Sequence, residues 1–383
     1  MTERKPATRL IHERHQRLTP PTVNPPIERG STVLFDEPSD LYTAKPSYGR
    51  MGLTVHRELE AALAGLETAS HVLLAPNGLA ACALAIASVL EAGDHALIQD
   101  SLYGPTRRFC ERRLNAMGIT VTRFSPRATP DDLEHLWRDN TKAIVLESPG
   151  SLTFELPDTR AIADYARSSD LVTVMDNTWG AGVFHKPLDL GMDISIQALT
   201  KYAVGHADAL GGAVMTRNEK LANAIASCSE DWGISLGPDD AYLALRGLRT
   251  LETRLARHQS TGLALAEWLL THPAVDTVLH PALPQHPDHA IWKRDFSGAC
   301  GLFGVALKPV SKTQVHDMLR RLELFGMGFS WGGYESLLIP CDPQLNRKAT
   351  SELPEGPLLR IHAGLEDPDD LIEDLGAAFS LLT

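Results

Sequence analysis

Lys201 is the residue of this chain whose surroundings best suit covalent chemistry. It follows an apolar, β-branched run at residues 194–196 and precedes a segment of small residues, 205–212, which leads into a second apolar run. This pattern predicts a strand, a turn and another strand, with the lysine at the end of the first strand. An amine held there, partly removed from water, has a lowered pKa and can form a Schiff base with an aldehyde. Most lysines are solvated surface charges, so this interpretation depends on the other segments.

A carboxylate, Asp176, ends the apolar run 171–176. A partly buried carboxylate at the carboxyl end of a strand needs a cation or several hydrogen-bond donors. One such cation is a protonated pyridine nitrogen, whose ring then acts as an electron sink. The alternative is an aspartate that caps its own loop. The residues alone leave both interpretations open.

Gly78 and Leu79 open a predicted helix directly after the apolar run 71–75. Backbone N–H groups and the partial positive charge of a helix N-terminus favour an anion there. No GxGxxG or GxxxxGK[ST] pattern is present, so a single phosphate monoester is favoured over a dinucleotide or a nucleoside triphosphate. The alternative is a glycine required only for a tight turn between strand and helix.

Two tyrosines are candidates for ligand contacts. Tyr103 lies near the edge of the sheet where ligands are expected, and Tyr48 lies in the N-terminal arm. Tyr103 follows the predicted strand 95–100, so its ring could stack on a planar cofactor. Its phenol could exchange protons if a nearby cation lowered its pKa, but a packing residue is the alternative. Tyr48 and Arg50 lie in a proline-rich segment and could bind phosphate oxygens, across a subunit boundary if that segment is an arm.

Arg360 lies inside the short apolar run 358–362, where an unpaired charge would be costly. It therefore needs an anion, and a substrate carboxylate is a natural bidentate partner. The alternative is an internal salt bridge with Glu366 or Asp367.

Two further segments contain residue types that could bind a ligand or a metal ion. The Gly332–Gly333 pair allows close approach of the backbone to a ligand, with Trp331 as a flat wall. His206 and Asp208 lack a third ligand nearby, so local hydrogen bonding that orders the loop after Lys201 is favoured over a metal site. We expect no metal.

Helical and strand patterns alternate before Lys201. Helices are expected at 56–68, 78–93, 105–118, 130–139 and 158–169, and strands at 71–75, 95–100, 119–124, 142–147 and 171–176. Near-continuous apolar strands between helices predict an α/β fold with a mostly parallel sheet covered on both faces. Such sheets bind ligands at the carboxyl ends of their strands, where Gly78, Asp100, Glu147 and Asp176 stand.

The chain is expected to divide into three parts. Residues 1–52 contain many prolines and little periodicity, which predicts an extended arm able to reach another subunit. Residues 53–240 form the large domain and 241–383 a smaller C-terminal α/β domain, joined by a long helical stretch at 237–272. In the smaller domain we expect strands at 301–307, 335–339 and 358–362, and helices at 311–325 and 368–382.

The composition favours a small-molecule ligand. The chain has 383 residues, with 36 Lys plus Arg, 48 Asp plus Glu and a net charge of −12, which argues against nucleic acid or an anionic membrane as partner. Five cysteines without a CxxC pair indicate reduced thiols. The N-terminus lacks an apolar leader segment and no stretch reaches the length of a membrane span, so we expect a cytoplasmic protein.

Eight segments together resemble the cysteine/methionine-metabolism family of pyridoxal-5′-phosphate (PLP) enzymes, fold type I. In chain order they are SYGRMG, PNGLAA, SLYGP, ESPGS, MDNTWGAG, SIQALTKYAVGHAD, SWGGYES and LRIHAGLED. The resemblance covers nearly the whole chain. It implies the aspartate aminotransferase-like fold of PLP-dependent transferases, with PLP as cofactor.

The resemblance also implies a role for each candidate residue. Lys201 would carry the cofactor as a Schiff base, Asp176 would pair with the pyridine nitrogen, and Tyr103 would stack on the ring. The phosphate would be held by Gly78, Leu79 and Thr200, together with Tyr48 and Arg50 of a neighbouring subunit. The substrate α-carboxylate would be bound by Arg360 with the backbone at Ser330 and Trp331. Leu79 departs from the methionine that relatives often carry, which matters little if its backbone amide is the contact.

Within the family, the segment ESPGSLTFE and Trp331 resemble the β-lyase branch rather than the γ-synthase and γ-lyase branches. This implies α,β-elimination of cystathionine to homocysteine, pyruvate and ammonia, in methionine biosynthesis. Lys201 would remove the Cα proton and protonate the leaving thiolate, and Tyr103, if ionised, could accept a proton from the substrate amine. A homotetramer of paired dimers is implied by the family.

Three alternatives stay open on the residues. The chain could act mainly on cysteine, cystine or cysteine S-conjugates, or be a γ-lyase or γ-synthase, because pocket shape decides side-chain specificity. It could also be a non-catalytic regulator. Retention of Lys201, Asp176 and Arg360 together argues against the regulator, since binding alone requires neither a Schiff-base amine nor an electron sink.

Overall fold

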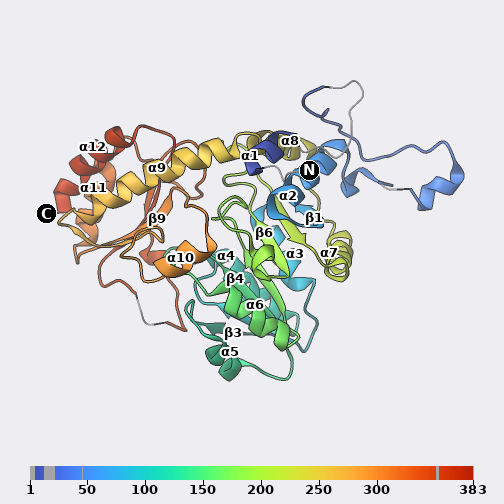
Figure 1. Cartoon of the computed structure of the whole chain (residues 1–383), viewed down its shortest axis with the longest axis horizontal. Helices are drawn as coiled ribbons and strands as arrows, with labels where there is room; N and C mark the ends of the chain where they lie inside the picture. The colour runs from blue at the N-terminus through green and yellow to red at the C-terminus, as the bar shows by residue number, and fades with distance from the viewer. Residues whose placement is uncertain (1–4, 13–21, 45, 351–352, 383) are drawn as a thin grey trace.

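A seven-stranded sheet forms the centre of the larger part of the molecule (Figure 1). The computed structural model describes residues 5–12, 22–44, 46–350 and 353–382. The strands are β1 (His71–Ala75), β2 (His95–Gln99), β3 (Thr120–Phe124), β4 (Thr141–Glu147), β5 (Val172–Asp176), β6 (Ile194–Gln197) and β7 (Gly212–Thr216), in the order β1-β7-β6-β5-β4-β2-β3. β7 is antiparallel to both of its neighbours and the other pairs are parallel. The predicted mostly parallel sheet is confirmed.

Apolar side chains on both faces of this sheet explain why helices cover both. Alternate residues of β2, β4 and β5 enter two different cores, because successive side chains of a strand point to opposite faces. Ile98, Val145 and Val174 lie in the core that contains α3, whereas Leu97 and Ile144 lie in the core that contains α5 and α6. The helices of this part are α2 (Thr54–Glu67), α3 (Gly78–Ala87), α4 (Gly104–Phe109), α5 (Pro130–Leu136), α6 (Thr159–Ser168), α7 (Glu219–Trp232) and α8 (Pro238–Leu248).

Several predicted helices differ from the observed ones: α5 ends at Leu136 and not at 139, and the helix predicted at 311–325 ends at Arg321. α3 ends at Ala87, six residues before the predicted end at 93. α4 ends at Phe109 and continues as one π-helical turn, Cys110–Leu114. The stretch 237–272 is two helices, α8 and α9 (Leu251–Leu270), because α8 packs on α2 while α9 runs across to the smaller sheet (Figure 1). Periodicity indicates an apolar face, but it does not show where a helix must change direction.

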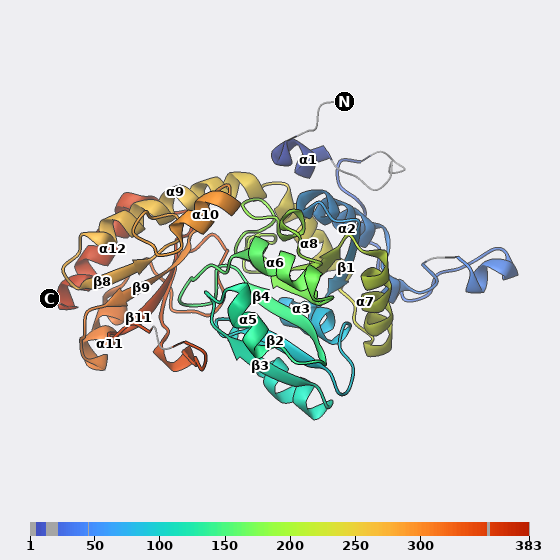
Figure 2. The same ribbon diagram turned by 60° about the horizontal axis from the view of Figure 1, so that its bottom comes forward.

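The smaller part of the chain is built on a four-stranded antiparallel sheet (Figure 2). Its strands are β8 (Val275–Leu279), β9 (Leu302–Leu307), β10 (Leu337–Pro340) and β11 (Leu358–His362), in the order β10-β11-β9-β8. The helices are α9, α10 (His289–Asp295), α11 (Lys312–Arg321) and α12 (Pro368–Phe379). The apolar sides of α9, α11 and α12 share one core with the sheet. Strand β8 and helix α10 were not predicted, because neither carries a marked apolar period.

The N-terminal arm leaves the body of the molecule (Figure 1). Helix α1 (Pro6–His12) packs against α2, and the following described segment carries only the short 3₁₀ turns Pro38–Tyr42 and Gly49–Met51. Leu34 and Tyr42 are 89% and 95% exposed, so these two side chains have little apolar cover within the described chain, although Arg29 of the same segment pairs with Asp239 on α8. Residues 1–4, 13–21 and 45 of the predicted arm lie outside the described residues. The boundaries after 52 and 240 stay predictions, the second falling inside α8.

The described helices include none whose length and apolar character would suit a membrane span.

Candidate active site

Lys201 lies in the turn after β6, four residues past the strand's last residue, Gln197. Its Nζ donates a hydrogen bond to Ser330 Oγ at 2.7 Å and lies 5.2 Å from the centroid of the Trp331 ring. Burial, and then the charge of Arg360, lower the pKa of Lys201 to about 8, although Asp176 acts in the opposite direction. A fraction of this amine is therefore neutral near pH 7, as a nucleophile toward an aldehyde must be.

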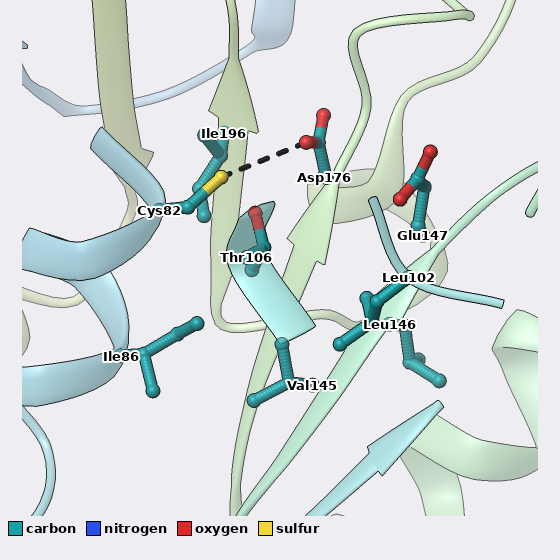
Figure 3. A pocket seen from close by; sticks show the side chains of 9 residues that line it. All are labelled: Cys82, Ile86, Leu102, Thr106, Val145, Leu146, Glu147, Asp176 and Ile196. Atoms are coloured by element: carbon teal, nitrogen blue, oxygen red, sulfur yellow. Dashed lines mark hydrogen bonds between the residues drawn. The ribbon is translucent and has the colours of Figure 1, made fainter. Parts of the chain in front are cut away.

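Asp176 and Glu147 end neighbouring strands and lie side by side (Figure 3). Asp176 Oδ1 accepts hydrogen bonds from the Thr178 amide at 3.0 Å and from Thr178 Oγ1 at 2.5 Å. Its Oδ2 lies 3.6 Å from Cys82 Sγ, and it makes no salt bridge with any described residue. Burial raises the pKa of Asp176, and burial with the nearby Asp176 raises the pKa of Glu147 to about 8. Asp176 thus caps its loop with one oxygen and presents the other without a cation.

A small hollow separates these carboxyl groups from the start of α3 and from α4 (Figure 3). The buried hydroxyl of Thr106 on α4 has no hydrogen-bond partner in the described part of the chain. The hollow is lined by Cys82, Ile86, Leu102, Thr106, Val145, Leu146, Glu147, Asp176 and Ile196. Its lining is mostly apolar, and such surroundings raise the pKa of both carboxyl groups.

The first turn of α3 meets the Lys201 turn at the same sheet edge. The Asn77 side chain accepts from the Ala80 amide at 2.9 Å, and the Asn77 carbonyl accepts from the Ala81 amide. The amides of Gly78 and Leu79 have no partner within the helix, because the first N–H groups of a helix never do. A Cβ on Gly78 would lie 2.4 Å from that of Ala198, so glycine is required for this close approach.

Thr200 belongs to this same turn, two residues after Ala198. Its Oγ1 lies 3.1 Å from the Gly211 amide and 3.2 Å from the Gly211 carbonyl. The structure therefore brings the predicted phosphate residues Gly78, Leu79 and Thr200 to one end of the sheet. It also shows the predicted local ordering after Lys201, since His206 Nδ1 lies 2.8 Å from the Val204 carbonyl.

Tyr103 stands at the N-terminus of α4 beside the two carboxyl groups. Its amide donates to Glu147 Oε2 at 2.5 Å, and the residue is 46% exposed. The sequence left open whether a nearby cation lowers the pKa of this phenol, and within the described chain the pKa shift has the opposite direction. Burial and then the charge of Glu147 raise the pKa of Tyr103, and they outweigh the lowering effect of Arg360.

Arg360, on β11, reaches the loop that carries Ser330. Its Nη2 donates to the Ser330 carbonyl at 2.9 Å, and burial lowers its pKa. The alternative of an internal salt bridge is wrong within the described chain. Glu366 accepts instead from the amide and hydroxyl of Ser336 at 2.7 and 2.9 Å, and Asp367 lies 3.7 Å from Arg257. Further N–H groups of Arg360 are left for a carboxylate ligand.

Tyr48 and Arg50 do not join the other residues within one chain. The Arg50 guanidinium carbon lies 5.8 Å from the centroid of the Tyr48 ring. Arg50 lines a separate cavity of about 550 Å³ between α2, β1 and α7, whose lining contains none of the residues around Lys201. An arm that exchanges between two copies would account for this separation.

Three residues near the site received no role from the sequence. Cys82 lies 3.6 Å from Asp176, and Glu147 lies beside it. His362 lies two residues after Arg360 on β11, and therefore on the same face. That spacing is the signal that could have found His362, whereas only the sheet order places Glu147 next to Asp176.

The residues present fit PLP. A buried amine with a lowered pKa suits an aldehyde, a buried carboxylate without a cation suits a protonated ring nitrogen, and free amides at a helix N-terminus suit a phosphate.

The comparison with known families agrees with this geometry. The sequence profile of the Cys/Met metabolism PLP-dependent enzymes matches residues 7–380. This chain belongs to that family. The cofactor and the fold predicted from the resemblance are thereby confirmed.

Individual relatives of this chain are named for different activities. The chain is 42% identical over 366 residues to a cystathionine beta-lyase of Bordetella avium, covering 93% of this chain and 91% of the relative. It is 38% identical over 379 residues to an L-alanine/L-glutamate racemase of Wolbachia pipientis wMel, covering 94% and 93%. The solved cystathionine gamma-lyase of Lactobacillus plantarum, complexed with L-serine, superposes with a TM-score of 0.91 at 30% identity and 99% coverage of both chains.

Proposed function

We propose that this chain is a PLP-dependent carbon–sulfur β-lyase that converts L-cystathionine by α,β-elimination to homocysteine, pyruvate and ammonia, a step of methionine biosynthesis. The observation that carries the proposal is the position of the Lys201 amine, which is hydrogen-bonded to Ser330 Oγ at 2.7 Å, while Arg360 on β11 donates to the carbonyl of the same serine. The name of the Bordetella relative supports cystathionine as the substrate.

The cofactor would be held by residues from four parts of the chain. Lys201 would bind its aldehyde, Asp176 its ring nitrogen and Tyr103 the face of its ring. The phosphate would be bound by Gly78, Leu79 and Thr200 and by Tyr48 and Arg50 of a second copy. When bound, PLP supplies an electron sink for the pair left behind when the Cα–H bond breaks.

The proton transfers fall to Lys201. With a pKa of about 8, its amine can accept the Cα proton, and the resulting ammonium can deliver a proton to the sulfur that leaves. Ser330 Oγ holds the Nζ in place, while Arg360 and the backbone at Ser330 and Trp331 hold the substrate carboxylate. Because the pKa of Tyr103 is raised, we assign Tyr103 to stacking and not to proton transfer.

Product analysis with purified protein tests the reaction. We expect pyruvate and homocysteine from cystathionine, and α-ketobutyrate as the main product would contradict a β-lyase. Lys201→Ala should reduce the elimination rate about a thousandfold, since positioned proton transfer contributes about that much. Borohydride should attach the cofactor to Lys201 in the unaltered protein and to no residue in the variant.

Racemisation is a second candidate, because a relative at 38% identity is named an L-alanine/L-glutamate racemase. Both reactions begin with removal of the Cα proton, the step assigned to Lys201. A chiral assay with L-alanine separates them: D-alanine formation without pyruvate from cystathionine would favour the racemase. Steady-state comparison of cystathionine with cysteine and cystine separates the β-lyase alternatives.

We further propose a cytoplasmic homotetramer in which neighbouring copies share active sites. The support is the arm, which keeps Tyr48 and Arg50 away from Lys201 of the same chain and leaves Leu34 and Tyr42 exposed. Mixing the inactive variants Arg50→Ala and Lys201→Ala tests this. Reassembled mixtures should recover activity, because some sites then combine an intact arm with an intact lysine, and no recovery would contradict shared sites.

A further inference from the structure

A buried pair of histidines, His258 and His362, lies directly behind the Lys201 turn. His362 is 1% exposed and follows Arg360 by two residues on β11, and His258 on α9 is fully buried. Their ring centroids are 5.2 Å apart, and both rings contact Tyr202, the residue after Lys201, with centroids 5.1 and 6.0 Å away.

His362 contacts the backbone of the loop 330–333. Its Nε2 lies 3.1 Å from the Gly332 amide, which donates to it. On the other side, the same glycine packs against the Lys201 turn: a Cβ there would lie 2.9 Å from the Lys201 carbonyl carbon and from the Tyr202 nitrogen. Gly332 has a φ of +85°, which favours glycine. The loop is therefore clamped between the catalytic turn and an imidazole.

Strand β11 thus holds this loop at two points. Arg360 donates to the Ser330 carbonyl at 2.9 Å, and His362 accepts from the Gly332 amide. Ser330 itself has a φ of +79°, a conformation that a serine adopts only when its surroundings impose it. The hydroxyl of Ser330, the residue at the first point, is the acceptor for Lys201 Nζ. Moving the Gly332 contact would move the serine and the carboxylate site with it.

The hydrogen bonds define the protonation of both rings. His258 Nδ1 lies 2.8 Å from the Ala363 carbonyl, which only accepts, so Nδ1 carries the proton and Nε2 the lone pair. His362 Nε2 also lies 3.1 Å from the Gly333 carbonyl, but Gly333 is partly exposed and Gly332 is buried. The buried amide has the greater need of a partner, so Nε2 is the acceptor and Nδ1 carries the proton.

Each ring keeps one nitrogen that makes no hydrogen bond to a described residue. His258 Nε2, an acceptor, and His362 Nδ1, a donor, are both buried and have no hydrogen-bond partner in the described part of the chain. Both rings are neutral, because burial lowers the pKa of His362 to about 3 and that of His258 to about 4. A neutral His362 is required, since an imidazolium could not accept from Gly332.

We propose that His362 is a positioning residue for recognition of the substrate α-carboxylate, because it holds the loop 330–333 at the Gly332 amide. This inference rests on the proposed function only in using Lys201, Ser330 and Arg360 as the site for an amino acid. It requires no particular side chain on that amino acid.

Binding of two small amines to the holoenzyme tests the proposal. Glycine carries the α-carboxylate and methylamine lacks it, and both are followed by the change in cofactor absorbance. In His362→Leu we expect the affinity for glycine to fall at least about tenfold, the size expected for leaving a buried amide unpaired. The affinity for methylamine and the cofactor content should stay within about twofold, because methylamine has no carboxylate for the loop to bind and the other proposed cofactor contacts lie on other segments.

Matched variants separate positioning from general damage. His362→Gln retains an acceptor for the Gly332 amide and should recover most of the glycine affinity. His280→Leu replaces a fully buried histidine that packs on Phe303 in the smaller sheet, and it should leave the ratio of the two affinities unchanged. The proposal would be overturned if His362→Leu lost affinity for both amines equally, or for neither.

A third variant keeps the test decisive if His362→Leu does not fold. His362→Asn keeps a polar amide in the buried site but is one methylene shorter than His362→Gln, so it no longer reaches the Gly332 amide and we expect glycine affinity to fall about tenfold. Unchanged glycine affinity in His362→Asn, with His362→Leu unfolded, would reduce His362 to a packing residue. Failure of the proposed function would instead appear in the unaltered protein, as absence of pyruvate from cystathionine.

Discussion

Asp100 and Asp176 occupy equivalent places in the sheet and are satisfied in opposite ways. Asp100 directly follows β2, is fully buried, and has Arg123 Nη1 3.0 Å away and the amides of Lys348 and Ala349 at 2.7 Å. Asp176 ends β5, is half-buried, and its hydrogen-bond partners among the described residues are Thr178 and the Cys82 thiol. A strand-end carboxylate with complete partners stabilises the fold, whereas one that lacks a cation is prepared for a ligand that supplies it.

The largest effect is expected at Asp176. Asp176→Asn should reduce the rate of pyruvate formation about a thousandfold, because a neutral amide cannot hold a protonated ring nitrogen. The same change should raise the urea midpoint of the cofactor-free protein, since it removes one of two adjacent buried carboxyl groups. Loss of both activity and stability would contradict the idea that this carboxylate is strained without its ligand.

Asp100→Asn should have the opposite signature. Removing one partner of a buried ion pair destabilises a protein by about 3 kcal/mol, and Arg123 would keep Glu111 as its one ion-pair partner among the described residues, together with the neutral Asn346. Urea unfolding measures this loss, and the specific activity of the folded fraction should change by less than about threefold. If activity fell as steeply as in Asp176→Asn, the distinction between the two aspartates would be invalid.

Glu147 sharpens the comparison through its pH dependence. Burial, and then the adjacent Asp176, raise its folded pKa to about 8, well above the usual value for a glutamate, so the folded state favours the protonated carboxyl. That stabilisation is complete below the unfolded pKa and is lost as pH rises through about 8. Cofactor-free Glu147→Gln should therefore gain stability over the unaltered protein between pH 5 and pH 8, by at least about 2 °C in melting temperature. If the difference in melting temperature between the two proteins stayed constant across this range, ionisation of Glu147 would not destabilise the fold.

Cys82 should contribute least. Cys82→Ala removes a weak donor 3.6 Å from Asp176 and leaves a small cavity, which costs about 1 kcal/mol. We expect the elimination rate to change by less than about threefold, because the two Thr178 bonds still orient Asp176. A hundredfold loss would show that the thiol, and not the missing cation, distinguishes Asp176 from Asp100.

Sequence patterns predicted most of the large sheet and the residues that gather at its edge. The apolar runs at β1, β2, β4 and β5 appear in the structure with boundaries shifted by one residue at most. Strand β8, the break between α8 and α9 and the high pKa of Tyr103 escaped prediction. Each depends on residues distant in the chain. The pKa of Tyr103 is raised by burial and then by Glu147, which lies on a strand whose place in the sheet the sequence did not predict.

The sequence by itself determined the alternation of helices and strands, the order of the motifs and hence the family, because periodicity and turn chemistry are local. Tertiary structure alone decided which acids are paired and which wait for a ligand. Asp100 receives its amides from a segment 248 residues further along the chain, and His362 meets Gly332 only when β11 packs behind the catalytic turn. A buried charge or imidazole acquires its state from such contacts, since solvation and partners set its free energy.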